Sequence, residues 1–519
     1  SRGLGDVYKR QHMQYSYTEA NMAELSNYQG ALNDIWRDGW PTLPVYREDG
    51  TFAVPQDNPR ISTLFGDAAY WNPVANYKEV TTKSNVSRLL GDVYAEFQLA
   101  KGLTFKTNFG LDIANKRDYN YTTSKITTST GYGKGGNGYT KKMSRLTENI
   151  LSYMNEWGDH RFTATGVYSW QNYMYETLSI SGNGFANDET GAWDMGQANR
   201  ETVEYGSDKY ENSLISWTGR VTYAYKDRYL LTATARYDGS SRFGENNKWG
   251  FFPSASVAWV LTEEEFMEGI SWVRNLKIRL GYGLSGNQDA IDSYNSLRLM
   301  KPNGVVSVNG APTVTLGTIR NANPDLKWET TVTRNVGLDY TLFGGKLTGS
   351  IEYYKNTTKD LLIAFPVSGS GYDYQYRNLG KTENKGFEIS LTWNIISKKN
   401  YELSFNGNVG FNKNKVKNLG TLSQYPASSG WASTQIQDDF IVKPGHSVGE
   451  IYGYVTAGRY EVSDFEDYYA SGEKWVLKQD VASNAGVIGA SYLRPGALKL
   501  KNIDDSDNVI DEKDRTVIG

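Results

Sequence analysis

Apolar and polar residues alternate with period two in three segments between Arg228 and Asn287. The apolar positions are Tyr229, Leu231, Ala233, Ala235 and Tyr237 in the first segment, Ala255, Val257, Trp259 and Leu261 in the second, and Leu276, Ile278, Leu280, Tyr282 and Leu284 in the third. The positions between them are mostly polar or small. A helix repeats every 3.6 residues and would mix the two sets, so the pattern predicts three β-strands, each with one apolar and one polar face.

The same alternation recurs along the chain in pairs of segments joined by very short turns. The clearest pair runs from Val93 to Leu99 and from Leu103 to Ile113 around the dipeptide Lys101-Gly102. Further pairs are joined by Gly158-Asp159, Lys226-Asp227, Gly344-Gly345 and Lys398-Lys399. Connections this short between alternating segments are a strong hairpin signal. With residues 14–29 as a less regular first strand, the chain is expected to contain about thirteen strands.

Long polar stretches separate these hairpins, so short and long connections alternate along the chain. The long ones are residues 114–143, 175–210, 240–252, 286–326, 359–382 and everything after 414, and the link at 262–274 is intermediate. Outer-membrane β-barrels have this asymmetry, with short periplasmic turns and long extracellular loops. Since each strand crosses once, parity places residues 415–519 at the long-loop end. We therefore expect a barrel segment at 14–414, followed by an extracellular segment at 415–519.

The aromatic content bears on the choice between membrane and soluble β-proteins. The chain has 38 Tyr, 14 Trp and 18 Phe in 519 residues, and no apolar run reaches the length that a transmembrane helix needs. Tyr and Trp suit places where an apolar surface meets water. The aromatic residues beside the short turns are Trp157, Tyr225, Tyr229, Phe343 and Tyr401. Together with the loop asymmetry, this favours a transmembrane barrel over a soluble, Tyr-rich β-protein, which composition alone would equally allow.

Charge, cysteine content and histidine placement exclude several classes of function. The formal net charge is −3 with no long basic run, so the footprint of a nucleic-acid-binding protein is lacking. The absence of cysteine excludes thiolate zinc sites and thiol catalysis. His12, His160 and His446 have no motif-spaced partners. The G-x-G-x-x-G match at 131–136 lies inside a Gly/Thr/Tyr-rich loop, which is not the setting of a nucleotide site. We expect no catalytic site.

Acidic residues cluster in two places. Glu263, Glu264 and Glu265, in the 262–274 link, are expected to form a solvated face. In the second cluster, at 504–514, the candidate metal ligands are Asp504, Asp505, Asp507 and Asp511. Carboxylates at alternate positions of a tight loop can converge on Ca²⁺ or Mg²⁺. No register of this run gives a full EF-hand loop with its terminal Glu, so the pattern favours a plain acidic turn without a cofactor.

Several segments resemble the SusC/RagA-type TonB-dependent outer-membrane transporters. The resemblance is carried by YDGSSRFGENNKWGFFPS, LKIRLGYGLSGNQ, AKGLTFKTNFGLDI, NPDLKWETTVTRNVGLDYTLFGGKLTGSIEYYKNTTKDLL, GKTENKGFEISL and VGEIYGYVTAGRY. It implies an all-β, antiparallel transmembrane barrel in the bacterial outer membrane that imports oligosaccharides or peptides. It also implies energy from the TonB complex and a SusD-like surface lipoprotein as a lid.

The resemblance also raises expectations about the two ends of the chain. Family members carry an N-terminal plug domain and a TonB-contacting segment, and neither is found in this sequence. Residues 1–13 resemble a non-native leader, and the sequence ends at Gly519 without the aromatic-ended strand that usually closes a bacterial barrel. Wide, plugged barrels of this type have about 22 strands. We therefore expect an incomplete barrel, with the plug and the C-terminal strands missing and with the sheet curved but open.

Substrate contacts in such a transporter are expected from loop aromatics, because sugar rings stack on aromatic faces. The candidates are Tyr372, Tyr374 and Tyr376 in SGYDYQYRN, and Trp431 in the loop that follows. The alternative role of these aromatic side chains is to pack the loops against one another or against a lid. Two other functions stay open. A passive porin needs neither TonB nor a lid, and a secreted β-sandwich that binds glycans would turn its apolar faces inward.

Overall fold

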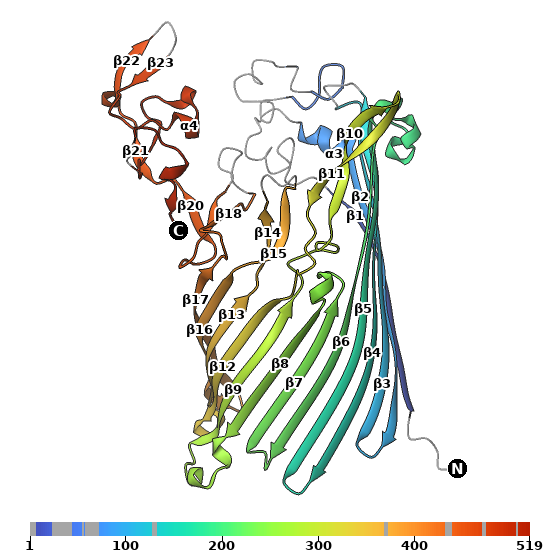
Figure 1. Ribbon diagram of the computed structural model, residues 1–519, viewed down its shortest axis with the longest axis vertical. Coiled ribbons are helices and arrows are strands. Elements are labelled where there is room, and N and C mark those ends of the chain that lie inside the picture. The colour runs from blue at the N-terminus through green and yellow to red at the C-terminus, as the bar shows by residue number, and fades with distance from the viewer. Residues whose placement is uncertain are drawn as a thin grey trace.

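The computed structural model describes residues 7–22, 44–53, 57, 72–126, 132–367, 372–430, 438–469, 474–504 and 507–519. Its main element is an antiparallel sheet of thirteen strands arranged in chain order (Figure 1). The strands are β1 (Val7–Asn21), β2 (Val80–Ala100), β3 (Leu103–Thr122), β4 (Gly133–Trp157), β5 (His160–Phe185), β6 (Glu204–Tyr225), β7 (Tyr229–Ser240), β8 (Trp249–Val260), β9 (Val273–Asn287), β12 (Glu329–Leu342), β13 (Leu347–Lys359), β16 (Lys381–Lys398) and β17 (Tyr401–Asn418). The predicted all-β antiparallel fold is confirmed, and this main sheet has the predicted number of strands.

The short turns depend on backbone conformations that few residues adopt without strain. Gly102 has a φ of +75°, and a Cβ at this position would lie 2.1 Å from the carbonyl oxygen of Met154, so glycine is required. Lys226 and Asp227 have φ values of 53° and 51°, as in the type I′ turns whose twist matches that of the flanking strands. All five predicted turns join neighbouring antiparallel strands, so the predicted hairpins are confirmed.

Several strands are longer than the alternation predicts at the end of the long connections. β3 continues to Thr122 and β4 begins at Gly133, inside the expected loop 114–143. β5 and β6 extend in the same way into 175–210. Beyond the bilayer both faces of a strand meet water, so the apolar set disappears while the hydrogen-bonded ladder continues. The predicted boundaries of these two loops are therefore wrong.

The sheet has two edges in the described part of the chain. β1 pairs only with β2 there, and β17 pairs only with β16, so the sheet is open as predicted. β1 begins at Val7, which pairs with Phe97, so residues 7–13 take part in the fold although they belong to the segment that resembles a non-native leader. The first strand, expected at 14–29, therefore starts earlier and ends at Asn21.

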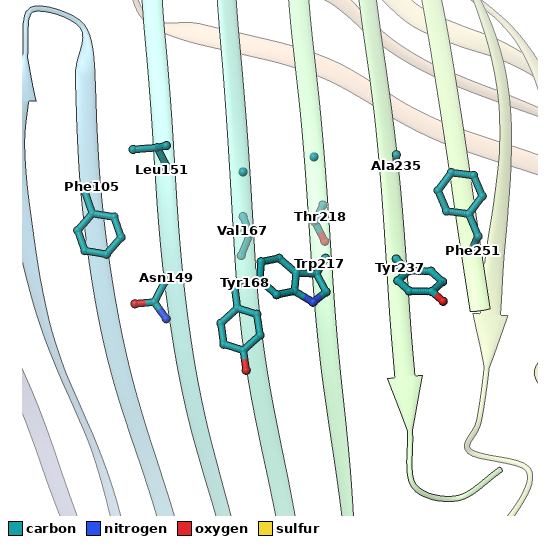
Figure 2. Close-up of a pocket in the computed structure, with 12 residues that line it drawn as sticks. Phe105, Asn149, Leu151, Val167, Tyr168, Trp217, Thr218, Ala235, Tyr237 and Phe251 are labelled. Atoms are coloured by element: carbon teal, nitrogen blue, oxygen red, sulfur yellow. The ribbon is translucent and has the colours of Figure 1, made fainter. Parts of the chain in front are cut away.

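One face of the sheet is apolar and exposed. Leu231 and Val257 lie directly opposite each other and are 41% and 46% exposed, while Ile278 is half-buried on the same face. Figure 2 shows a further part of this face, where the side chains that border a shallow groove include Tyr168, Trp217, Tyr237 and Phe251. Soluble proteins rarely expose an apolar surface of this extent, whereas a barrel turns such a band toward lipid. The β-sandwich alternative requires these side chains inside a core and is wrong.

Aromatic side chains gather at the short-turn end, as a membrane-interface girdle requires. The ring of Tyr229 stacks beside Tyr225 and Trp259, with centroid distances of 6.4 and 6.5 Å. Trp272 stacks on Phe343 at 5.7 Å. These contacts confirm the expected aromatic belt beside the short turns.

Glu264 binds this girdle to the link between β8 and β9. Its carboxylate accepts hydrogen bonds from the Tyr229 hydroxyl at 2.6 Å and from Trp259 Nε1 and Arg228 Nη1 at 2.8 Å each. Glu263 and Glu265 are exposed, as a solvated face predicts, but the Glu264 side chain is only 12% exposed. The expected solvated face is therefore wrong for the middle glutamate.

The long-connection end carries most of the remaining elements. They are α3 (Pro73–Glu79), β10 (Leu299–Val308), β11 (Ala311–Arg320), β14 (Leu362–Pro366), β15 (Tyr374–Asn378), β18 (Tyr425–Ala427), β19 (Phe440–Val442), β20 (Glu450–Gly453), β21 (Thr456–Arg459), β22 (Phe465–Tyr469), β23 (Lys474–Leu477), α4 (Ala485–Ile488), β24 (Leu498–Leu500) and β25 (Thr516–Val517). In Figure 1 the elements β18 and β20 to β23 and the C-terminus lie at the end opposite the short turns, where parity places them. The extracellular placement of residues 415–519 stays a prediction. No helix in the described ranges is long and apolar enough to cross a membrane.

Short 3₁₀ helices complete the structure. They are η3 (Gly191–Trp193), η4 (Met195–Gln197), η5 (Arg200–Thr202), η6 (Glu245–Asn247), η7 (Leu261–Glu263), η8 (Glu265–Met267), η9 (Phe343–Gly345), η10 (Val462–Asp464), η12 (Ala490–Tyr492) and η13 (Glu512–Asp514). Two of them, η7 and η8, form the link of intermediate length that joins β8 to β9.

Candidate functional site

The polar face of the sheet, opposite the apolar one, carries paired charges at its centre. We call this group the lumen network; it consists of Lys277, Arg279, Asn335, Asp339 and Glu352. The Arg279 guanidinium donates to both carboxylate oxygens of Asp339 at 2.8 Å and to Glu352 at 2.6 Å. Lys277 Nζ is 2.9 Å from Asp339, and Asn335 Nδ2 donates to Glu352 at 3.2 Å. The network therefore joins β9, β12 and β13 across the polar face.

Strand alternation builds the lumen network beside the lipid-facing set. Lys277 and Arg279 flank Ile278, and Asp339 follows Leu338, so charged and apolar side chains leave the same strands in opposite directions. Two cations face two carboxylates, and all four side chains keep part of their surface exposed. Such a wall is nearly neutral and hydrated, so it can exchange hydrogen bonds with a passing solute without retaining the solute by charge.

Two further contacts extend the polar wall to β2 and β3. Arg88 forms a bidentate pair with Asp112, with N···O distances of 2.8 and 2.6 Å. The Lys106 ammonium lies 3.8 Å from the ring centre of Tyr94, a cation–π contact. Asp112 therefore balances the charge of Arg88, as in the lumen network, whereas Lys106 contacts a neutral ring.

An apolar cluster at the long-connection end holds the loops against the strands. Its buried members are Phe243, Phe252, Ile291, Leu326 and Trp328. The Trp328 ring lies 4.6 Å from that of Phe243 and 5.3 Å from that of Phe252. Because these residues come from separate connections and strands, their packing fixes the rim above the polar wall.

A buried arginine fixes the adjoining loop. Arg320, at the end of β11, donates to Asn295 Oδ1 at 2.7 Å and to the carbonyl oxygens of Tyr294 and Leu297 at 2.8 and 3.2 Å. A buried guanidinium that binds three acceptors on one loop sets the course of that loop. This role was not evident from the sequence, in which Arg320 follows the uncharged stretch TVTLGTI.

Three of the predicted substrate-contact residues lie at this rim, in and beside β15. The rings of Tyr374 and Tyr376 meet edge to face at 5.7 Å. Tyr376 packs against the apolar cluster, and burial is the main cause that raises its pKa. Its ring therefore takes part in the packing of the loops. All three tyrosines are half-buried and stay candidates for substrate contact. Trp431 lies outside the described residues.

The acidic run is organised around Asp514, which is fully buried. Its Oδ1 accepts from the backbone N–H groups of Ile503 at 2.6 Å and Asp504 at 3.2 Å, and its Oδ2 accepts from that of Asp511 at 2.9 Å. Burial raises the pKa of Asp514, but these hydrogen bonds outweigh burial, and its pKa lies below the ordinary value. The sequence did not distinguish Asp514 from its neighbours, because only the fold shows which carboxylate is buried.

A hard cation such as Ca²⁺ needs oxygen ligands from several groups that converge on one point. Asp507 and Asp511 each accept a hydrogen bond from the backbone N–H two residues later in the chain, at 2.8 and 2.7 Å. Asp504 supplies a backbone N–H to the buried carboxylate, and Asp505 lies outside the described residues. In the part of the chain that the structure describes, no three carboxylate or histidine side chains converge as a metal site. A Ca²⁺ or Mg²⁺ site at 504–514 stays a prediction.

Comparison with known proteins gives one family match and several relatives. The family model "TonB dependent receptor-like, beta-barrel" matches residues 26–508. TonB-dependent receptor P26 of Formosa agariphila is 32% identical over 411 residues, covering 78% of this chain and 40% of the relative. TonB-dependent receptor SusC of Bacteroides thetaiotaomicron is 29% identical over 447 residues, covering 80% of this chain and 43% of the relative. The chain thus spans less than half the length of these two relatives.

Solved structures share the fold. The structure of the RagAB peptide transporter has a TM-score of 0.69 and 23% identity, covering 86% of this chain and 46% of that chain. The RagAB peptide importer in its closed-closed state has a TM-score of 0.74 and 22% identity, covering 92% and 52%. At these identities the likeness establishes the architecture of the sheet.

Proposed function

Because the chain belongs to the TonB-dependent receptor-like β-barrel family, we propose that it forms the barrel wall of an outer-membrane transporter. This transporter imports oligosaccharides or peptides with energy from TonB. The observation that carries this proposal is the two-faced sheet. Its exposed apolar face suits lipid, and its polar face, with the balanced lumen network, suits a hydrated solute. The proposed role is transport rather than catalysis.

A SusD-like surface lipoprotein is the proposed lid. The hairpin β10–β11 projects from the long-connection end (Figure 1), and every residue of β10 is exposed. On this hairpin Val305, Val314 and Leu316 are 63%, 59% and 60% exposed. Apolar side chains at this level are beyond the reach of lipid, so their exposure favours a protein partner.

The proposed route for the substrate runs past the loop rim and along the polar wall. Tyr372 and Tyr374 would meet it at the rim, where aromatic faces suit both sugar rings and apolar peptide side chains. Amides and hydroxyls on the wall, together with the lumen network, would then replace part of its hydration shell. This chemistry fits both substrate classes, and the uptake experiment distinguishes them.

Uptake of labelled oligosaccharides and labelled peptides, measured in cells that produce the full-length protein, tests the proposal. Saturable uptake that stops when TonB is deleted or the proton motive force is collapsed would support it. Uptake that continues without TonB would support the passive porin instead, because diffusion through an open barrel needs no coupled energy. Recovery of a surface lipoprotein with the purified transporter tests the lid separately.

A further inference from the structure

Four cations lie side by side on the outer face of β12, β13, β16 and β17. They are Arg334, Lys355, Lys385 and Lys413, called the cationic row from here on. In the strand register Arg334 is directly opposite Lys355, Lys355 is opposite Lys385, and Lys385 is opposite Lys413. Like charges that face each other across neighbouring strands destabilise a sheet. An anion bound along the row would offset this repulsion.

Carboxylates within the described chain compensate the row only in part. Lys355 Nζ is 3.1 Å from Glu383, and Glu383 is shared with Lys417 at 3.6 Å. The other three members of the row form no ion pair with any described carboxylate, and all three are exposed. The chain as a whole has a net charge of −3, so the row does not reflect a generally basic surface.

The row stands at the upper edge of the lipid-facing band. Two residues closer to the short-turn end, on the same face of the same strands, are Val336, Tyr353, Phe387 and Phe411. These four apolar side chains are 48%, 46%, 38% and 66% exposed. Cations placed directly above an aromatic and aliphatic row lie at the level where lipid headgroups meet the hydrocarbon.

A groove of about 460 Å³ runs beneath Arg334 and Lys355, which form part of its lining. Its apolar lining comes from Ala255, Val257, Leu280, Tyr282, Val336 and Tyr353. The guanidinium of Arg334 lies 5.7 Å from the ring centre of Tyr282, which holds the charge at one end of the groove. An apolar groove with two cations at its mouth matches a molecule with a hydrocarbon chain below and an anionic group above.

We propose that the cationic row and this groove bind a membrane lipid with an anionic phosphate headgroup. The phosphate lies against Arg334 and Lys355, an acyl chain occupies the groove, and Lys385 and Lys413 contact a neighbouring headgroup. Arginine suits the phosphate because its planar donors match phosphate oxygens in pairs. The inference rests on the proposed placement in the outer membrane. Lipid is favoured over an acidic protein because the apolar band continues directly below the cations.

Lipid binding to the full-length protein, purified in a neutral detergent, tests the proposal. The ligands are dimyristoyl phosphatidylglycerol, dimyristoyl phosphatidylcholine with the same acyl chains, and inorganic phosphate. Bound lipid is counted by native mass spectrometry, and the thermal midpoint is followed in parallel. We expect the wild type to bind the anionic lipid at least about tenfold more tightly than the zwitterionic one. The variant R334Q/K355Q/K385Q/K413Q should lose this preference.

The control variant removes four exposed lysines from the long-connection end and keeps the cationic row: K301Q/K478Q/K501Q/K513Q. It makes the same change in net charge and should keep the preference for the anionic lipid. In lipid-free detergent the row variant should be at least as stable as the wild type, because the repulsion along the row is relieved. If the row variant does not fold, R334Q/K385Q provides the same test with two charges removed.

Three results would overturn the proposal. They are equal affinity of the wild type for both lipids, an unchanged preference in the row variant, and a thermal shift with inorganic phosphate as large as that with the anionic lipid. The last result would mean a site for free anions. Failure of the proposed function is distinguishable, since a chain outside the membrane would bind neither lipid and support no TonB-dependent uptake. Normal uptake without a preference for the anionic lipid would refute only the lipid site.

Discussion

Replacing Leu338 with arginine would place a cation in the middle of the lipid-facing band. Leu338 lies on β12 between Arg334 in the cationic row and Phe343 in the short-turn girdle. Each strand residue advances about 3.3 Å, or about 2.5 Å along the membrane normal at a tilt of about 40°. The nine steps from Arg334 to Phe343 therefore span about 23 Å, close to the height of about 25 Å expected for the apolar band. Leu338 sits near the centre of that span.

No neighbour of Leu338 on this face can compensate the new charge. The residues directly opposite Leu338 are Ile278 and Ile351. An arginine on the lipid face at the bilayer midplane costs about 2–4 kcal/mol. We therefore expect Leu338→Arg to lower the free energy of unfolding by about 2–4 kcal/mol. Arg279 lies at nearly the same depth on the other face, where Asp339 pairs with it.

Thr232→Arg is the matched control on the polar face. Thr232 lies between Thr222 and Ser256 in the sheet, so the new side chain would point into the hydrated lumen among hydroxyl groups. We expect this change to cost less than about 1 kcal/mol. Both variants of the full-length protein are folded into phospholipid vesicles and titrated with guanidinium. Equal costs for the two variants, or a larger cost for Thr232→Arg, would refute the assignment of the two faces.

Three further predictions concern the long-connection end. Val314→Asp combined with Leu316→Asp should abolish recovery of the lid lipoprotein and leave the thermal midpoint of the barrel unchanged; recovery at the wild-type level would remove the hairpin from the interface. Asp514→Asn should destabilise residues 498–519 by about 1.5–3 kcal/mol, because an amide nitrogen replaces one acceptor oxygen, and hydrogen exchange measures the loss. In the wild type the pKa of Asp514 is lowered on folding, so the stability contributed by its carboxylate should persist above about pH 4 and disappear as the pH falls further; loss of protection near pH 6 would contradict this assignment.

The hairpins and the lipid-facing set could be predicted because the bilayer imposes its pattern on each strand separately. The alternation around Leu231, Val257 and Ile278 depends on neighbours two residues away, so it is readable without knowledge of the fold. The upper ends of the strands could not be predicted in this way. Where both faces of a strand meet water, the pattern disappears, and β3 and β4 continue through residues that look like a loop.

Contacts between strands could not be predicted from the sequence because they depend on the register of the strands. Arg279 and Asp339 are separated by a long connection, and the sequence does not show which residues of β9 and β12 stand opposite each other. The cationic row is a stronger case, because its four members become neighbours only when β12, β13, β16 and β17 are aligned. Three adjacent glutamates posed a related difficulty, since only the fold brings three donors to Glu264.

The candidate substrate contacts differ in their packing, and the sequence could not show this for the same physical reason. Tyr372, Tyr374 and Tyr376 are equivalent in the sequence, each separated from the next by one residue. Packing against the apolar cluster distinguishes Tyr376 from the other two. Burial is a property of the assembled loops, so the pattern could suggest the segment and could not choose among its rings.

A cysteine scan of β12 tests the two-faced wall most directly, because the chain has no cysteine of its own. Single cysteines from Val336 to Thr341 in the full-length protein are exposed, in outer-membrane vesicles, to a water-soluble thiol reagent. A second set carries a fluorophore that lipid-borne spin labels quench. We predict quenching at Val336, Leu338 and Tyr340. We predict labelling from water at Gly337, Asp339 and Thr341. Equal quenching and labelling along the whole segment would contradict a wall with lipid on one face and a hydrated path on the other. Quenching at the positions expected to face water, with labelling at those expected to face lipid, would contradict it as well.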